Sequence, residues 1–267
     1  MIIVGQNHDM KTTRFKSISV TFFICFFAAL FSCAAGHIEN RLSPDELAYF
    51  SDSFDNMRQD LWYRAESLHR DEQVQSYIQA DLDFTDGRLI IRTKTGSFSK
   101  GGLSSRFYLK GDFDVQLECR MDFKFGNFHM DQVFSFAVLE KTSKPEKISF
   151  VSIGLALPGG GDSGTLFSHC VLNGRRKKGF MQQIGNFRGS LRIIRAGQTI
   201  STSYKNEGSS GWNPMDTFRL GDDDMMIGFQ LRNFFVKRTA IVAADSISIE
   251  IDGFKMNAAR EIVKEEL

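Results

Sequence analysis

The most constraining feature of this sequence is a strict alternation of apolar and polar residues from Phe113 to Phe125. In an extended strand, alternation places all the apolar side chains on one face and the polar ones on the other, whereas on a helix they would scatter around the axis. One face must then be buried and the other wetted, which is typical of antiparallel sheets in a sandwich. The apolar positions are Phe113, Val115, Leu117, Cys119, Met121, Phe123 and Phe125.

Further strand candidates follow at short intervals, separated by turn signals. Asp86-Gly87 indicates a turn before the strand at 88–93, and Asn173-Gly174 is typical of a type I′ hairpin turn. The chain holds 26 Phe and 23 Gly, a composition that suits strands joined by tight turns. Many short strands predict an all-β sandwich or barrel. The expected strands cover 88–93, 132–139, 148–157, 166–172, 191–195, 199–204, 225–232 and 246–251.

The N-terminal segment 1–32 has the pattern of a cleaved export signal. Lys11, Arg14 and Lys16 precede a mostly apolar run over 18–31. That run suits a signal peptide and is short for a membrane-spanning helix, which needs roughly 20 residues. We therefore expect the protein to be exported.

Cys33 ends a segment, Leu30-Phe31-Ser32-Cys33-Ala34, that resembles a bacterial lipobox. The resemblance implies that Cys33 is lipidated and becomes the new N-terminus. Each buried methylene contributes ~0.8 kcal/mol, so several acyl chains would hold the protein on a membrane surface, periplasmic or at the cell surface. Ordinary cleavage after this segment, which would give a secreted protein, is the alternative.

Beyond the signal, we expect a polar linker over 33–46, one domain over 47–257 and a short charged helical tail over 258–267. The formal net charge of +1 gives no support to a nucleic-acid partner. Cys119 and Cys170 both fall inside the domain. Export makes a disulfide between them feasible, and two reduced, buried thiols are the alternative.

The start of the expected domain resembles a known family. Phe50-Ser51-Asp52-Ser53-Phe54-Asp55, followed by Leu61-Trp62, is similar to the opening of bacterial concanavalin A-like, laminin-G-like jelly-roll domains. Segments 111–115, 191–200, 227–229 and 246–251 resemble their central strand, next hairpin and last two strands, in the right order. The resemblance implies an antiparallel two-sheet jelly-roll sandwich that binds carbohydrate or a cell-surface glycan.

Jelly-roll glycoside hydrolases of the laminarinase type carry Glu residues at alternate positions of one strand, which act as nucleophile and general acid. The nearest match, Glu250-Ile251-Asp252, lacks the second Glu and lies at the end of the domain. We therefore assign no catalytic residue and expect binding rather than catalysis. A glycan-acting hydrolase or lyase and a structural protein-interaction sandwich remain alternatives.

Two aromatic residues are candidates for sugar contact. Trp212 lies in a Gly- and Ser-rich stretch that favours exposure, and His129 lies in the segment Phe128-His129-Met130. Trp62, in contrast, is expected in the core.

Two charged loops complete the candidates. Asp222 and Asp224 follow Gly221 and could supply oxygen ligands for calcium, with a solvated acidic turn as the alternative. The basic run 175–178 follows a hairpin turn. It is expected to be a solvated tip, or else to contact anionic glycan or lipid head groups.

Overall fold

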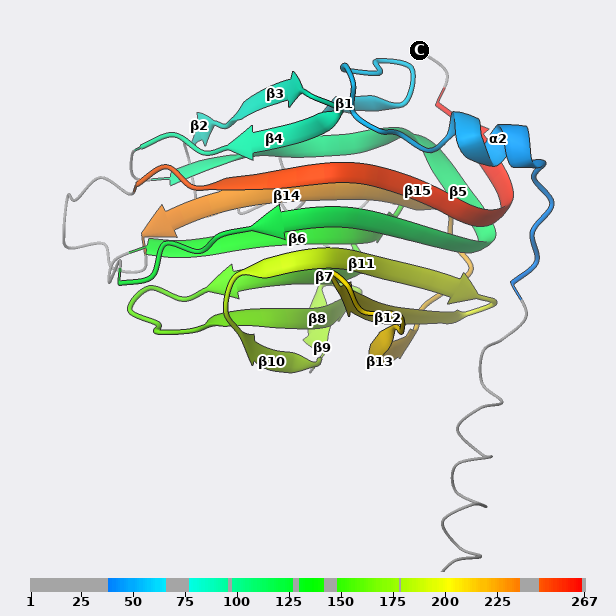
Figure 1. Ribbon diagram of the computed structural model, residues 1–267. Helices are drawn as coiled ribbons and strands as arrows, with labels where there is room; N and C mark the ends of the chain where they lie inside the picture. Colours follow the sequence, from blue (N-terminus) through cyan, green and yellow to red (C-terminus); the bar gives the residue numbers. More distant parts are fainter. Residues whose placement is uncertain are drawn as a thin grey trace, which may run out of the picture. The chain divides into compact units, whose positions relative to one another are not determined.

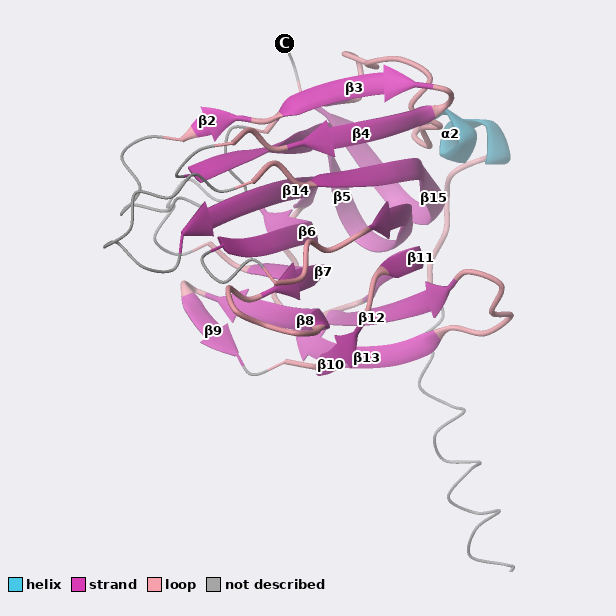
Figure 2. Ribbon diagram, turned by 60° about the vertical axis from the view of Figure 1, so that its left-hand side comes forward, coloured by secondary structure: helices cyan, strands magenta, loops and turns pink. Residues whose placement is uncertain are grey.

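The computed structural model describes residues 38–65, 77–95, 98–126, 130–141, 148–177, 179–235 and 245–265. The described residues all belong to one compact unit of the chain, 37–267. They form strands almost throughout, with one short helix (Figure 2). The predicted all-β class is confirmed. In this described part, no helix is long and apolar enough to cross a membrane.

The elements follow one another along the chain, most of them with short connections. They are α2 (Pro44–Tyr49), β1 (Trp62–Arg64), β2 (Ile78–Gln79), β3 (Asp81–Thr85), β4 (Arg88–Arg92), β5 (Phe98–Met121), β6 (Met130–Glu140), β7 (Phe150–Leu157), β8 (Gly164–Leu172), β9 (Arg175–Lys177), β10 (Met181–Ile184), β11 (Phe187–Ala196), β12 (Thr199–Asn206), β13 (Asn213–Arg219), β14 (Met225–Phe235) and β15 (Ser248–Lys264).

The long strand β5 belongs to two sheets (Figure 1). Its first half pairs with β14, which continues the order β10-β8-β7-β6-β14-β5; we call this sheet one. Its second half pairs with β11 on one side and β15 on the other, within the order β13-β12-β11-β5-β15-β4-β3; we call this sheet two. The halves meet at Gly111, whose φ of 76° favours glycine.

The two sheets pack face to face and enclose the core. Thr202 of β12 donates a hydrogen bond of 3.0 Å across the sandwich to Ser168 of β8. On β5, the alternating apolar residues from Phe113 to Met121 are at most 1% exposed, as predicted. The prediction fails at its end, where Phe125 is 43% exposed. β5 stops at Met121, so the sheet no longer determines which way Phe125 points.

Trp62 is fully buried, as expected, and its ring packs edge-on against Phe107, Phe229 and Phe254. These aromatic residues come from both sheets, so the indole joins the two layers. The turn at Asp86-Gly87 and the hairpin turn at Asn173-Gly174 are also confirmed. In each of them both turn residues have positive φ, as a type I′ turn requires: Asp86 at 51° and Gly87 at 68°, Asn173 at 50° and Gly174 at 74°.

The predicted helical tail was wrong. Residues from Ala258 to Lys264 continue β15 and pair with β5, where Ala259 is fully buried. Pairing and burial outweigh the helix propensity of this charged segment.

The last part of the expected linker is also tied to the domain. The amide of Arg41 donates to Ala259, and Ser43 caps α2 through a reciprocal pair of hydrogen bonds with Glu46.

Cys119 and Cys170 are free thiols, both buried, on β5 and β8. The disulfide considered from the sequence is not formed in the structure. The structure instead has the alternative arrangement, two buried and reduced cysteines. As small apolar groups, they fill the core without bonding to each other.

Candidate functional site: a pocket on the outer face of sheet one

The outer face of sheet one is lined by short side chains on its central strands and by large ones toward its edge. One row of neighbours crosses β5, β14, β6, β7, β8 and β10 in register: Gly102, Gln230, Ser135, Gly154, Phe167 and Met181. The next row runs from Ser104 through Gly228, Ala137 and Ser152 to His169. The change from small to large side chains leaves this face hollowed.

A pocket of about 290 Å³ occupies this hollow. Ligand pockets commonly measure about 300–1,000 Å³, so its size is at the lower end of that range. Its lining combines aromatic, cationic and small polar side chains, among them Phe150, Phe167, His169, Arg176, Arg232 and Ser135.

His169 is held in place from several directions. Its Nδ1 lies 3.1 Å from the hydroxyl oxygen of Ser152, the neighbour in register on β7. Its ring lies 5.4 Å from that of Phe150 and 5.5 Å from that of Phe167, measured between centroids. The pocket therefore has a polar ring fixed between two aromatic side chains.

Gln230 lies beside this pocket and carries a buried polar atom without a partner. It is 5% exposed and pairs in register with the pocket residue Ser135. Its Nε2 makes no hydrogen bond. Such buried donors are rare in folded proteins and each calls for an explanation. Arg106, which projects from the same face of β5, likewise has a buried Nε without a partner.

Positive charge gathers on the same face. Arg176 and Arg232 line the pocket, and its described lining contains no Asp or Glu. Lys100 of β5 pairs in register with Arg232, and its ammonium lies 4.1 Å from the centre of the Tyr77 ring. The outer face of sheet one therefore carries positively charged side chains in and beside the pocket.

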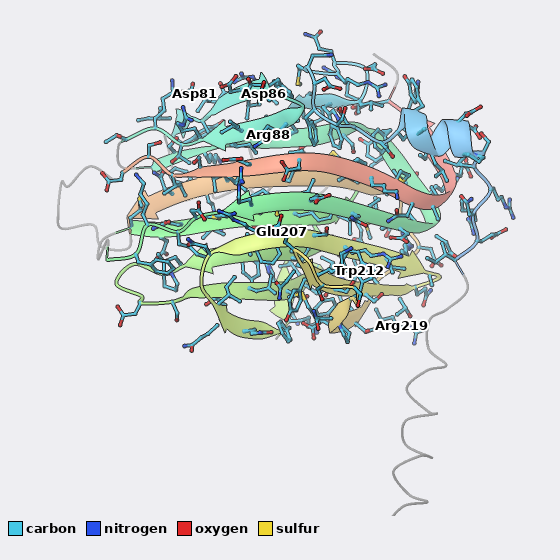
Figure 3. The ribbon with its side chains drawn as sticks, in the orientation of Figure 1. Asp81, Asp86, Arg88, Glu207, Trp212 and Arg219 are labelled. Carbon is cyan, nitrogen blue, oxygen red and sulfur yellow. The ribbon has the colours of Figure 1, made fainter. Side chains whose placement is uncertain are left out.

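Trp212, predicted as a ligand contact, lies on the other side of the sandwich beside β12 and β13 (Figure 3). It is half-buried, with the guanidinium of Arg192 at 5.1 Å and the ammonium of Lys205 at 5.4 Å from its ring centre. Arg192 projects from the outer face of sheet two, where it pairs with Asp114. The structure thus does not bring Trp212 to the pocket. His129 and Cys33 lie outside the described residues.

The acidic loop at Asp222 and Asp224 surrounds an arginine. Arg195 is 1% exposed and donates hydrogen bonds to the carbonyl oxygens of Gly221 (2.6 Å) and Asp223 (2.7 Å). A guanidinium therefore occupies the place where carbonyls of this loop converge. The residues that the structure describes contain no group of three or more His, Cys, Asp or Glu side chains arranged to hold a metal. Calcium binding at Asp222 and Asp224 stays a prediction.

Glu250 and Asp252, the nearest match to a hydrolase motif, project from the outer face of sheet two. Glu250 accepts hydrogen bonds from Arg88, labelled in Figure 3, at 3.0 Å and from Arg120. Desolvation raises the pKa of Glu250, but the two arginines outweigh it and hold that pKa below its ordinary value. A general acid needs a raised pKa, so this carboxylate is suited to an ion pair.

A second, shallower hollow of about 460 Å³ lies at one end of sheet two. Asp122 and Glu207 line it, together with Arg188 of β11. It is the one place among the described pockets of this size where two carboxylates line the same space.

Sequence reasoning missed the pocket residues Phe167 and His169, and Gln230 beside them. Their strands were predicted, but a pocket depends on which residues become neighbours across five strands. The one available signal was the basic run 175–178, because Arg176 lines the pocket.

No protein-family model matches the sequence, and no curated protein matches it. Solved structures do match the fold. A LamA variant from Zobellia galactanivorans in complex with laminaritriose and laminaritetraose has a TM-score of 0.55 at 12% identity, covering 78% of this chain and 97% of that one. The CBM2 module of the evolved Dit protein from Lactobacillus casei BL23 phage J-1 has a TM-score of 0.56 at 9% identity, covering 78% and 95%. Bacillus licheniformis β-glucanase has a TM-score of 0.51 at 12% identity, covering 78% and 96%.

At these identities the likeness shows the fold alone. The chain has the fold of an antiparallel jelly-roll β-sandwich, as the sequence predicted.

Proposed function

We propose that this protein is an exported, lipid-anchored module that binds carbohydrate in the pocket on the outer face of sheet one. One observation carries the proposal: His169 lies between the rings of Phe150 and Phe167, and all three side chains line the pocket. Aromatic rings can pack against the C–H face of a sugar ring, while side-chain donors bond its oxygens. Ligand pockets commonly combine an apolar lining with a few placed polar groups in this way.

The fold supports the same proposal. Its solved neighbours include a carbohydrate-binding module and glycan-acting enzymes, one of them in complex with oligosaccharides. A fold hosts many functions, so the assignment of binding depends on the residues of the pocket.

A binding assay with pocket variants tests the proposal. Titration of the protein with a panel of soluble polysaccharides should identify a ligand, and Phe167→Ala should weaken its binding about tenfold or more. Phe125→Ala, which removes an exposed ring outside the pocket, is the matched control. Trp212→Ala separates the two faces: if it alone abolishes binding, the site lies on sheet two and the pocket proposal is wrong.

Export and anchoring are tested separately at Cys33. The wild-type protein should fractionate with membranes and incorporate a labelled fatty acid, and Cys33→Ser should do neither. A protein that is released without lipid in both forms would show ordinary signal cleavage instead.

Glycan hydrolysis is the second candidate, favoured only by the hollow that Asp122 and Glu207 share. Release of reducing ends from a bound polysaccharide, lost in both Asp122→Asn and Glu207→Gln, would establish it. Binding without cleavage supports the module.

A further inference from the structure

We infer that the saccharide bound in this pocket carries acetyl groups. This inference rests on the proposed function and narrows its ligand class. The pocket has an unequal lining, aliphatic at one end and polar at the other, and an acetylated saccharide complements both ends.

The aliphatic end of the pocket lies where β7 finishes. Val133 of β6 and Ala156 of β7 are neighbours in register on the outer face, and Pro158 directly follows β7. All three line the pocket, and none of them is buried. Their side chains contain no polar atom. A sugar hydroxyl group placed against them would lose its hydrogen bonds to water and gain no side-chain partner, which is unfavourable.

Phe167 and Met181 extend this apolar surface toward the edge of the sheet. They are neighbours in register on β8 and β10, and Met181 is 72% exposed. The neighbour of Phe167 on β7 is Gly154, where a Cβ atom would come within 2.7 Å of the Phe167 ring. The absence of a side chain at Gly154 therefore allows this ring to reach over β7, the strand that carries Ala156.

The polar end of the pocket lies toward the start of β7. His169 and Arg176 line it together with Phe150, the first residue of that strand. Phe150 and Ala156 lie near opposite ends of β7, so about 20 Å of strand separates them. This length suits an oligosaccharide better than a single sugar ring.

An acetyl group matches the aliphatic end because it combines a methyl group with a carbonyl oxygen that accepts a hydrogen bond. Thr165 pairs in register with Ala156 and brings a hydroxyl donor to the lining there. The methyl group contacts Val133 and Ala156, while Thr165 donates to the carbonyl oxygen. The hydroxyl groups of the same saccharide are left for the polar end.

The test compares saccharides that differ in acetylation, using the intact protein. Naturally acetylated xylan and the same xylan after removal of its esters with mild alkali form one pair. Chitohexaose and cellohexaose form the other, since cellohexaose has the same backbone with a hydroxyl group in place of each acetamido group. In at least one pair, the acetylated member should bind about tenfold more tightly in isothermal titration calorimetry, because its counterpart places hydroxyl groups against the aliphatic end.

Val133→Thr and Val171→Thr are matched variants for this test. Both valines are partly exposed on the outer face of sheet one, but Val133 lines the pocket and Val171 is not among its lining residues. The substitution keeps the shape of the side chain and adds a hydroxyl group. Val133→Thr should reduce the preference for the acetylated member about threefold or more, and Val171→Thr should leave it unchanged. Both should unfold at the wild-type temperature, which shows that the fold is intact.

Thr165→Val tests the hydrogen bond to the acetyl group. This change removes the hydroxyl group and keeps the shape of the side chain. It should weaken binding of the acetylated member about threefold or more and affect its counterpart less. Equal effects on both members would overturn the role assigned to Thr165.

The outcomes separate this inference from the proposed function. Equal binding of both members of each pair, lost in Phe167→Ala, would overturn the acetylated ligand and leave the binding module in place. Binding of an unacetylated polysaccharide when neither acetylated probe binds would do the same. A preference that persists in Val133→Thr, or falls equally in Val171→Thr, would also overturn the inference. Binding of dodecanoate in preference to every saccharide would assign the pocket to an aliphatic chain, and failure of every saccharide to bind would defeat both proposals.

Discussion

The indole nitrogen of Trp62 donates a hydrogen bond of 2.8 Å to Oδ2 of Asp52 inside the core. The other oxygen of the same carboxylate accepts the backbone N–H of Phe54, also at 2.8 Å. Phe54 has a φ of 61°, a left-handed conformation that is unusual for an aromatic residue, and this bond helps to hold it there. The buried carboxylate of Asp52 thus links Phe54 to Trp62, which belong to the two segments, 50–55 and 61–62, of the motif at the start of the domain.

Replacing Asp52 by alanine should destabilise the protein by about 2–4 kcal/mol, because two buried donors would lose their acceptor. Urea unfolding followed by tryptophan fluorescence measures the change. Asp55→Ala removes an exposed carboxylate three residues away and should change stability by less than about 0.5 kcal/mol. Equal effects of the two substitutions would show that the Asp52 hydrogen bonds contribute nothing specific.

The strands that carry the core were predictable because burial on one face leaves a period of two in the sequence. The first half of β5 was missed, since residues such as Lys100, Gly102 and Ser104 are buried on its outer face and break that pattern. The end of β15 was missed for a different reason. Its Ala- and Glu-rich residues favour a helix locally, and only pairing with β5 makes them a strand.

The candidate site was less predictable than the fold. His169 and Gln230 are 61 residues apart in the sequence and are brought to one face by β14, β6, β7 and β8. Strand order of this kind is not encoded in any local pattern. The sequence also did not show that the acidic loop surrounds Arg195, because that arginine comes from a distant strand, β11.

The unpartnered amide of Gln230 should cost stability. Gln230→Met keeps the length of the side chain but removes the buried donor, so the protein should become more stable by about 1 kcal/mol. Thermal and urea unfolding provide the measurement.

Gln132→Met is the matched control for this prediction. Gln132 is also buried, but its amide both donates to and accepts from the backbone of Lys124, at 2.8 and 3.0 Å. The same substitution should therefore destabilise the protein by about 1–3 kcal/mol. The two substitutions should change the free energy of unfolding in opposite directions. A loss of stability in both would show that the missing hydrogen bond of Gln230 Nε2 does not destabilise the protein.

The ion pairs of Glu250 predict a dependence of stability on pH. Arg120 and Arg88 hold the pKa of Glu250 below its ordinary value of 4.5, so the unfolded chain binds a proton more readily than the folded protein does. The stabilisation is therefore present above the ordinary pKa and is lost as the pH falls through the lowered one.

In a pH titration of unfolding free energy, Glu250→Gln should lack this part of the acid-side decline. Because the carboxylate is 30% exposed, the difference from wild type at neutral pH should be below about 1 kcal/mol. Glu118→Gln, which removes an exposed carboxylate on the same face, is the matched control for the change of charge. Superimposable curves for wild type and Glu250→Gln would contradict the prediction.

The two cysteines of the domain should be chemically inert in the folded protein. Burial raises the pKa of Cys170 to about 11 and raises the pKa of the fully buried Cys119 further. The thiolate is the reactive form, so neither residue should react with iodoacetamide at pH 8 until the protein is unfolded. Peptide mapping by mass spectrometry should find both labelled in urea without any reductant. Ser209→Cys, which adds a thiol at an exposed position, should label under both conditions. If Cys119 and Cys170 label in urea only after reduction, they form the disulfide that the folded structure does not contain.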